Sequence, residues 1–358
     1  MRGEANERLR EVVDTKMIES LNKSILLATG EGEGTFYSPE ELMTMRLNSW
    51  QGWRCAAGFE NIHIGPIGQV TGAACSMPSY IGNIFEGPLN FPNDWLTCAV
   101  KWCMCGAAMR LRKAKTDDFR KELDRPNLVT DVRAPLKDVK DANLVTSPFL
   151  DIVRRYPKSV TWDISKRCNF NCSYCHPTIS NQTDPLRSRE QVFAAVFRII
   201  EGFGRGDRIS WVFTGGEPTL HSFYDELCEV LFRKQHLIHT QTNGSRLPAY
   251  YAKLIRFSTI GISVHLEFSP PEKILEVAKA IIAVKASDEI AAKHWFGVRI
   301  MTPPGWFEKA KDLSDRLEQL PGFKEHGLVF MSATYEREDR DQMMSYPDAE
   351  MKEILARS

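Results

Sequence analysis

The chain has 358 residues, of which 43% are hydrophobic and 26% are charged. This composition is that of an ordinary globular protein, and the length allows one large domain or two smaller ones. Lysine and arginine total 46, as do aspartate and glutamate, so the formal net charge is zero. A balanced charge gives no electrostatic reason to expect a nucleic acid or an anionic membrane as the main partner. The basic run at Arg110–Lys115 is interpreted as a solvated helix face.

The N-terminus and the cysteine content predict a cytoplasmic protein whose thiols bind metal. The opening residues are polar and charged, and they contain no apolar segment of the kind found in signal peptides. No stretch reaches the roughly 18–20 apolar residues that a membrane span requires. Because disulfides are rare in reducing compartments, the nine cysteines favour metal or cluster ligation.

The first third of the chain, residues 1–123, is expected to form a Gly-rich and Cys-rich region. A β-hairpin is predicted at Asn61–Ala73, because the sequence Gly-Pro-Ile-Gly at residues 65–68 favours chain reversal. Residues 124–157 contain four prolines among charged residues, and we interpret them as a connector.

From residue 158 to residue 358, short apolar strands alternate with amphipathic helices, which is the pattern of βα units in a parallel sheet. Strands are predicted at Val160–Ser165, Ile209–Thr214, Leu237–Thr242, Thr259–His265, Gly297–Thr302 and Leu328–Ala333. Helices are predicted at Arg189–Phe203, Ser222–Lys234, Pro248–Arg256, Pro271–Ala286, Trp306–Leu320 and Asp348–Arg357. Six such units are too few for a closed eightfold barrel. The predicted fold class is therefore α/β, with a partial, TIM-like (β/α)6 barrel after the Cys-rich region.

Three cysteines follow the first predicted barrel strand. Cys168, Cys172 and Cys175 lie in the sequence Cys-Asn-Phe-Asn-Cys-Ser-Tyr-Cys, on a loop where their thiolates can converge on one metal centre. Thiolates are the usual ligands of iron–sulfur clusters, and three of them leave one iron of a [4Fe–4S] cluster open to a cofactor or substrate. The alternative is a zinc site completed by a distant residue such as His176, although zinc sites more often contain paired CxxC units.

This motif, CxxxCxΦC with Tyr174 as the aromatic residue, resembles the signature of the radical S-adenosylmethionine (SAM) superfamily. The end of the second predicted strand, Gly215-Gly216-Glu217-Pro218, resembles the family's GGE segment, which engages the amino group of SAM. Glycines let a backbone approach a ligand closely, and the Glu217 carboxylate would meet the SAM ammonium. The resemblance implies that a reduced [4Fe–4S] cluster donates one electron to SAM. SAM then breaks into methionine and a 5′-deoxyadenosyl radical, which abstracts a hydrogen atom from the substrate.

The ends of the later strands fit the same family template, and the resemblance covers roughly residues 158–335. The Thr-Asn-Gly segment around Asn243 resembles the one that ends the third strand in the branch with the molybdopterin-precursor cyclase and the peptide-modifying enzymes. Ser263 occupies the place of a residue that contacts the SAM ribose or carboxylate. Arg299, on the fifth strand, is a further candidate for that carboxylate, with an outward-pointing side chain as the alternative. His265 departs from the family pattern, which has Asp there.

A second group of cysteines precedes the barrel. Its members are Cys55, Cys75, Cys98, Cys103 and Cys105. Four of these five thiolates could ligate an auxiliary [4Fe–4S] cluster. Cys55 and Cys75 bracket the predicted hairpin, which resembles that of SPASM/twitch auxiliary-cluster domains, although those domains normally follow the barrel and differ in their second half. Structural zinc and unliganded buried thiols are the alternatives. Cys228, in a predicted helix, is interpreted as a small buried hydrophobe.

Auxiliary-cluster relatives often oxidise peptides, proteins or small natural products, so the resemblance implies oxidative modification of a peptide or small-molecule substrate. It also implies an electron donor such as flavodoxin or ferredoxin. A redox-neutral epimerase or mutase is the alternative within the family. A non-catalytic iron–sulfur or zinc protein is the alternative outside it.

Overall fold

The computed structural model describes residues 25–29, 34–37, 39–73, 80–103, 109, 111–122, 142, 144–146, 156–175, 183–334 and 344–357. The chain divides into two compact units. Unit 1 comprises Met1–His63 and Val70–Lys158, and unit 2 comprises Ile64–Gln69 and Ser159–Ser358. The predicted start of the barrel at residue 158 lies next to the boundary between Lys158 and Ser159.

Unit 1 contains a sheet of six short strands in the order β2-β1-β9-β8-β3-β7. The strands are β1 (Ile25–Ala28), β2 (Gly34–Tyr37), β3 (Arg54–Cys55), β7 (Leu96–Thr97), β8 (Lys113–Ala114) and β9 (Leu144–Thr146). β1 is antiparallel to both β2 and β9, and all of its side chains are buried. Two short helices, α2 (Pro39–Thr44) and α4 (Asp117–Glu122), follow β2 and β8 in the chain.

The predicted hairpin is present as β4 (Asn61–Ile64) and β5 (Gln69–Thr71), with β6 (Gly82–Asn83) beside β5. The N–H of Gly68 donates to Gly65 O at 2.9 Å, and the N–H of Gly65 donates to Gln69 O at 2.9 Å. Gly68 has a φ of +92°, a left-handed conformation that favours glycine. The turn sequence therefore reverses the chain as expected.

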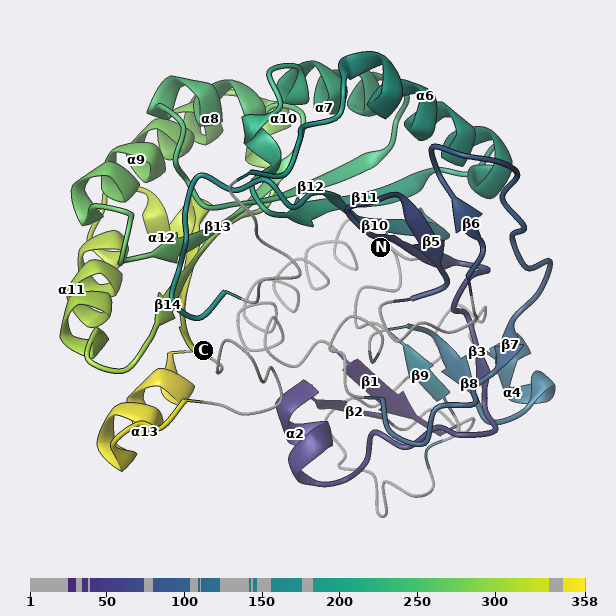
Figure 1. Ribbon diagram of the computed structural model, residues 1–358. Helices are drawn as coiled ribbons and strands as arrows, with labels where there is room; N and C mark the ends of the chain where they lie inside the picture. The colour runs from purple at the N-terminus through teal and green to yellow at the C-terminus, as the bar shows by residue number, and fades with distance from the viewer. Residues whose placement is uncertain are drawn as a thin grey trace, which may run out of the picture. The chain divides into compact units, whose positions relative to one another are not determined.

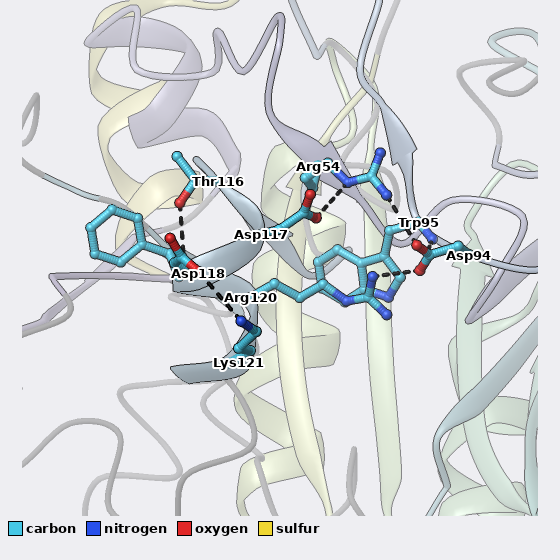
Figure 2. A network of polar contacts seen from close by, with 9 residues as sticks. Arg54, Asp94, Trp95, Thr116, Asp117, Asp118, Arg120 and Lys121 are labelled. Carbon is cyan, nitrogen blue, oxygen red and sulfur yellow. Dashed lines mark hydrogen bonds and ion pairs between the residues drawn. The ribbon is translucent and has the colours of Figure 1, made fainter.

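Figure 2 shows the polar network that joins β3 of unit 1 to the segments around β7 and α4. Arg54 forms ion pairs with Asp94 at 3.2 Å and with Asp117 at 2.9 Å. Asp94 also accepts the N–H of Trp95 at 2.7 Å and pairs with Arg120, whose guanidinium lies 4.9 Å from the centre of the Trp95 ring. Exposed ion pairs contribute about 0–1 kcal/mol each. Their main effect here is to fix α4 beside β3.

Two parts of unit 1 differ from the sequence predictions. The range 124–157, interpreted as a connector, contains β9, which pairs with β1 and β8 and is part of the sheet. The basic run at residues 110–115 contains β8, not a helix face, and Lys113 within it is 1% exposed. The Lys113 ammonium donates to Leu111 O at 3.0 Å and lies 4.6 Å from the centre of the Trp50 ring. These partners replace water around the Lys113 charge. They lie elsewhere in the fold, so the local sequence does not predict the burial of this lysine.

Unit 2 is built on six strands that are neighbours in chain order within their sheet. They are β10 (Lys158–Ser165), β11 (Ile209–Gly215), β12 (Leu237–Thr242), β13 (Thr259–His265), β14 (Phe296–Thr302) and β15 (Leu328–Ala333). The four pairs from β11 to β15 are parallel. Burial alternates along β12, so one face of the strand is covered and the other is partly exposed.

Helices alternate with these strands in the chain. They are α6 (Arg189–Ile199), α7 (Tyr224–Arg233), α8 (Pro248–Leu254), α9 (Pro271–Ser287), α10 (Glu289–Ala292), α11 (Phe307–Glu318), α12 (Phe323–His326) and α13 (Asp348–Ala356). Figure 1 shows α6 to α11 in a row along one side of the unit 2 strands, coloured teal to green. The α/β class and the parallel sheet are therefore confirmed, and the partial barrel stays a prediction. Within the part of the chain that the structure describes, none of the helices has the length and apolarity needed to cross a membrane.

The predicted bounds of β12, β13 and β15 coincide with the observed ones. The helix predicted at Arg189–Phe203 is instead two elements, because α6 ends at Ile199 and a π-helical turn follows over Ile200–Gly204. Two glycines in this turn weaken the α-helix, and Arg205 then takes a left-handed conformation. The short helices α10 and α12 have too few residues to show a helical period, so the sequence did not predict them.

Four histidines of unit 2 are kept neutral by burial, and we expect them to make the fold sensitive to acid. They are His221, His236, His239 and His265. Burial lowers the pKa of each ring from 6.5 to about 4. Because the folded pKa lies below the unfolded one, stability is complete above pH 6.5 and is lost as the pH falls towards 4. Protonation of each ring should lower the free energy of unfolding by an amount on the order of 1–3 kcal/mol. The loss can be measured as a fall in the urea midpoint of the metal-free chain.

A histidine variant with a matched control tests this origin of the acid sensitivity. His236 Nδ1 accepts the N–H of Ile209 at 3.0 Å, a bond that a glutamine oxygen can also make. His236→Gln should therefore flatten the dependence of the urea midpoint on pH. His326→Gln, on the short helix α12, should leave it unchanged. If both variants keep the full dependence, the acid sensitivity has another source.

Candidate functional site

The loop after β10 holds the first cysteine group, at the carboxyl ends of the parallel strands. Cys172 is buried, and Cys168 and Cys175 are partly buried. The N–H of Cys175 donates to Cys172 O at 3.1 Å, and the N–H of Phe170 donates to Cys168 Sγ at 3.4 Å. Burial, with smaller contributions from the neighbouring Cys175 and Glu267, raises the pKa of the Cys172 thiol to about 12. Because thiolates are the species that bind metal, loading this loop must release protons.

Gly215 and Gly216 bring the end of β11 against this cysteine loop. The N–H of Gly216 donates to Ser165 O at 2.8 Å, and the N–H of Glu217 donates to Arg167 O at 2.7 Å. A Cβ on Gly216 would lie 2.2 Å from Arg167 O. A Cβ on Gly215, whose φ is +109°, would lie 2.5 Å from Ser165 O. The two glycines thus allow the end of β11 to approach another group closely, as the sequence predicts. The group that it approaches is the backbone at the end of β10 and the start of the cysteine loop.

The Glu217 carboxylate is fully buried and is satisfied by the chain itself. Its Oε1 accepts the N–H of Thr219 at 3.0 Å, the Thr219 hydroxyl at 2.6 Å and the Thr242 hydroxyl at 2.7 Å. Its Oε2 accepts the N–H of Asn243 at 2.6 Å. Burial raises the pKa of this carboxyl against the lowering effect of these hydrogen bonds. The side chain thus joins the ends of β11 and β12, and its predicted contact with the SAM ammonium stays a prediction.

Asn243 connects the end of β12 to the cysteine loop. Its Nδ2 donates to Asn169 Oδ1 at 2.9 Å and lies 3.7 Å from Cys168 Sγ. Its Oδ1 accepts the N–H of Ser245 at 3.0 Å. An N–H donor directed at a cysteine sulfur is the type of contact that tunes a metal-bound thiolate. Pro218, also a predicted site residue, is buried at the start of the 3-10 helix η3 (Pro218–Leu220).

The end of β13 holds the cysteine loop through Tyr174 and Ser173. The Tyr174 hydroxyl forms a hydrogen bond with His265 Nδ1 at 2.8 Å, and the two rings stack with centroids 5.7 Å apart. The Glu267 carboxylate accepts the N–H of Ser173 at 2.8 Å and also its hydroxyl. His265, which stands where the family has Asp, is therefore the partner of the aromatic residue in the cysteine motif.

Three residues in or beside this loop were not predicted as site residues. Within the loop, Asn169 Oδ1 accepts a hydrogen bond from the Asn243 amide. Outside it, Glu267 accepts the N–H of Ser173, and Phe268 stacks on Phe170 with ring centroids 5.3 Å apart. Glu267 and Phe268 lie two and three residues after β13, at the end of the parallel strand where active-site residues gather. That position, rather than the residue types, is the signal that could have identified them.

Ser263 and Arg299 are register partners on β13 and β14. Arg299 is exposed, whereas its chain neighbours Val298 and Ile300 are buried. Register partners on adjacent strands present their side chains on one face. The guanidinium therefore lies on the face that carries Ser263, away from the buried side of β14. Ser263 Oγ accepts a hydrogen bond from Gln241 Nε2 at 2.7 Å.

In unit 1, the described cysteines of the second group share one hydrophobic core. They are Cys55, Cys98 and Cys103. Cys75 and Cys105 lie outside the described residues. Burial raises the pKa of Cys98, Cys55 raises it further, and the cation of Lys113 opposes the rise. Cys228, in α7, is fully buried, which confirms its interpretation as a small hydrophobe.

Among the described residues, no three or more His, Cys, Asp or Glu side chains already surround a common metal position. The donor chemistry of the cysteine loop nevertheless fits an iron–sulfur cluster. It offers three thiols from one loop, with N–H groups of Phe170 and Asn243 directed at the sulfur of Cys168. Binding would deprotonate the thiols and turn them towards one point, which is how metal binding couples to local structure. His176, the alternative ligand of a zinc site, lies outside the described residues.

Residues 162–294 match the family model described as the Radical SAM superfamily. A curated protein, the GTP 3′,8-cyclase of Acidothermus cellulolyticus, is 32% identical over 117 residues, which is 31% of this chain and 32% of the cyclase. The chain thus spans about a third of the length of this curated relative.

Two solved structures are also similar to the chain. Streptococcus suis SuiB bound to the precursor peptide SuiA has 14% identity and a TM-score of 0.39, over 67% of this chain and 55% of that chain. TYW1 with a lysine–pyruvate adduct bound has 16% identity and a TM-score of 0.35, over 57% of this chain and 75% of that chain. The segment that matches the Radical SAM superfamily model contains both the three-cysteine loop and the Gly215–Pro218 segment.

Proposed function

We propose that this chain is a radical SAM enzyme that oxidatively modifies a peptide or a small molecule. Cys168, Cys172 and Cys175 would hold three irons of a [4Fe–4S] cluster, and SAM would occupy the fourth. When bound, the cluster supplies the electron that cleaves SAM to methionine and a 5′-deoxyadenosyl radical, which abstracts hydrogen from the substrate. A flavodoxin or ferredoxin would be the electron donor.

The observation that carries this proposal is that three strand ends are fixed to one cysteine loop. The backbone N–H of Glu217 donates to Arg167 at the start of the loop, Asn243 directs its amide to Cys168, and His265 bonds to Tyr174. These contacts leave the loop little freedom, which is what a site needs to keep a cofactor in one geometry. The proposed SAM site then extends from this loop along the partly exposed face of β13 and β14.

We assign the SAM carboxylate to Ser263 and Arg299, which lie side by side on that face. Ser263 is two residues before His265, a distance of about 6.6 Å along a strand. The Ser263 hydroxyl and the Arg299 guanidinium therefore lie two residues along the strands from the position at which His265 contacts the cysteine loop. Arginine and hydroxyl donors are suited to a carboxylate. Tyr174, Gly215, Gly216, Pro218 and Asn243 would line the rest of the SAM site.

We also propose an auxiliary [4Fe–4S] cluster in unit 1, held by four of its five cysteines. The support is that Cys55, Cys98 and Cys103 are buried in one core, with the Lys113 ammonium close enough to Cys98 to affect its pKa. A cluster with four thiolate ligands carries a net negative charge, and a buried cation nearby would offset part of it. Structural zinc is the alternative occupant.

Iron and sulfide counting on the anaerobically reconstituted chain separates the two proposed centres. We expect about eight irons in the wild type and about four in the Cys168/Cys172/Cys175→Ala variant, because each cluster contains four. That variant should form no 5′-deoxyadenosine from SAM. A variant that retains no iron would contradict the auxiliary cluster. A variant that still forms 5′-deoxyadenosine would contradict the assignment of the cysteine loop.

A further inference from the structure

A row of polar side chains lies on the partly exposed face of β12 and β13 in unit 2. In β12, His239 and Gln241 are partly exposed, whereas Ile238, Thr240 and Thr242 are buried. Strands in the middle of a parallel sheet usually carry apolar residues on both faces. The polar residues at 239 and 241 therefore call for an explanation other than packing.

These side chains form a continuous hydrogen-bonded chain that ends at Ser263. His239 Nδ1 lies 2.8 Å from Thr259 Oγ1 at one end. His239 Nε2 lies 3.4 Å from Gln241 Oε1, a longer contact in the middle of the chain. Gln241 Nε2 then donates to Ser263 Oγ at 2.7 Å. These hydrogen bonds thus link side chains on the partly exposed face of β12 to side chains of β13.

The orientation of the Gln241 amide sets the direction of the hydrogen bond at Ser263. Burial lowers the pKa of His239 to about 4, so at neutral pH its ring carries a single proton. Because Gln241 directs its NH2 group to Ser263, its oxygen faces the ring. The other ring nitrogen, Nδ1, lies beside the Thr259 hydroxyl, which donates to Ile238 O at 3.1 Å. Since Ser263 Oγ accepts from Gln241, the proton of Ser263 points to another acceptor.

The neighbouring glycine leaves space for this chain. A Cβ on Gly261 would lie 2.7 Å from Gln241 Oε1 and 3.2 Å from His239 Cε1. Gly261 and Ser263 are on the same face of β13, and Ser263 is the register partner of Arg299. The hydrogen bond from Gln241 therefore orients the Ser263 hydroxyl at a position beside the exposed Arg299 guanidinium.

We propose that Gln241, held by His239, is a positioning residue that orients the Ser263 hydroxyl as a hydrogen-bond donor to the SAM carboxylate. This inference rests on the proposed function, in which Ser263 and Arg299 receive that carboxylate. Gln241 and His239 act only through Ser263. Their loss should therefore weaken ligands that carry the carboxylate and spare ligands that lack it.

The first test is Gln241→Glu in the full-length, anaerobically reconstituted protein without reductant. Glutamate has no proton to give Ser263, so the hydroxyl turns towards it and away from the ligand. Losing a hydrogen bond to a charged group should weaken SAM binding about tenfold or more, measured by equilibrium dialysis. Binding of 5′-methylthioadenosine, which has no carboxylate, should be unchanged. Gln319→Glu adds the same charge at an exposed position and should affect neither ligand.

A second variant separates positioning from charge repulsion. Gln241→Met removes the donor without adding charge, and it should weaken SAM alone by a smaller factor. In the Ser263→Ala background it should have no further effect, since the two residues act as one unit. Equal weakening of SAM and 5′-methylthioadenosine, or no weakening of SAM, would overturn the inference while the proposed function stands. A wild-type protein that binds no SAM would overturn the proposed function itself.

Discussion

Gly216→Ala is expected to abolish both iron binding at the cysteine loop and the cleavage of SAM. The added Cβ would lie 2.2 Å from Arg167 O and 2.5 Å from Lys166 O. Both atoms belong to the backbone, so no side-chain rotation relieves the overlap, and the loop must move. Cys168 directly follows Arg167, and its displacement would spoil the convergence of the three thiolates. The measurements are iron per chain and 5′-deoxyadenosine formed, both after anaerobic reconstitution.

Gly305→Ala is the matched control for this prediction. Gly305 also lies in unit 2, has a φ of +82°, and has no atom within 4 Å of an added Cβ. Its substitution costs about 1 kcal/mol of backbone strain and displaces nothing. The Gly305→Ala chain should therefore keep its iron and its activity. If Gly216→Ala also kept both, the close approach of β11 would not be what fixes the cysteine loop.

Glu217→Gln is expected to lower the free energy of unfolding by about 2–4 kcal/mol, although the change is nearly isosteric. The carboxylate oxygens accept four hydrogen bonds from Thr219, Thr242 and Asn243 inside the protein. A glutamine has one accepting oxygen, so its NH2 group must face at least one of these donors. A buried donor without an acceptor costs about 1–3 kcal/mol, and two donors facing each other cost more. Urea unfolding at neutral pH measures the loss.

The pH dependence of the Glu217 contribution has the opposite sign to that of the histidines. Because burial raises its pKa above the usual 4.5, the folded state holds the proton more tightly than the unfolded state. The contribution of this carboxyl to stability therefore falls as the pH rises above 4.5, and Glu217→Gln should lack that slope. Glu276→Gln, at an exposed position of α9, is the matched control and should change stability little. Equal effects of the two substitutions would contradict the structural role of Glu217.

The parallel strands of unit 2 and the cysteine loop could be predicted because their signals are local. Alternating strands and helices and the three-cysteine spacing are each contained in short stretches of sequence. The predicted bounds of β12 and β13 coincide with the observed ones, and these two strands carry Asn243, Ser263 and His265. A strand end in a parallel sheet has a defined place, so knowing the strand was enough to group these residues at one edge.

The partners of the site residues could not be predicted, because they depend on register between distant strands. Glu217 reaches Thr242 and Asn243, which are 25 and 26 residues away, and Tyr174 reaches His265 across 91 residues. The resemblance to a family motif predicts a ligand for Glu217 but does not reveal its three partners within the chain, Thr219, Thr242 and Asn243. Gln241 could not be predicted as a site residue from the sequence, because its hydrogen bond to Ser263 depends on the packing of β12 beside β13.

Unit 1 was harder to predict from sequence for a different physical reason. Strands β3, β7 and β8 have two residues each, and such short segments show no periodicity. β9 lies in a proline-containing stretch and joins the sheet by pairing with β1, more than a hundred residues earlier in the chain. Lys113 is buried against an aromatic ring and backbone carbonyls, which no charge pattern indicates.

The most direct test of the account is the formation of 5′-deoxyadenosine by the reconstituted protein. Under anaerobic conditions, with SAM and dithionite, the wild-type chain should release 5′-deoxyadenosine and methionine in equal amounts. The Cys168/Cys172/Cys175→Ala variant should release neither. A wild-type chain that holds its iron and sulfide and yet forms no 5′-deoxyadenosine would contradict the claim that the cysteine loop after β10 cleaves SAM.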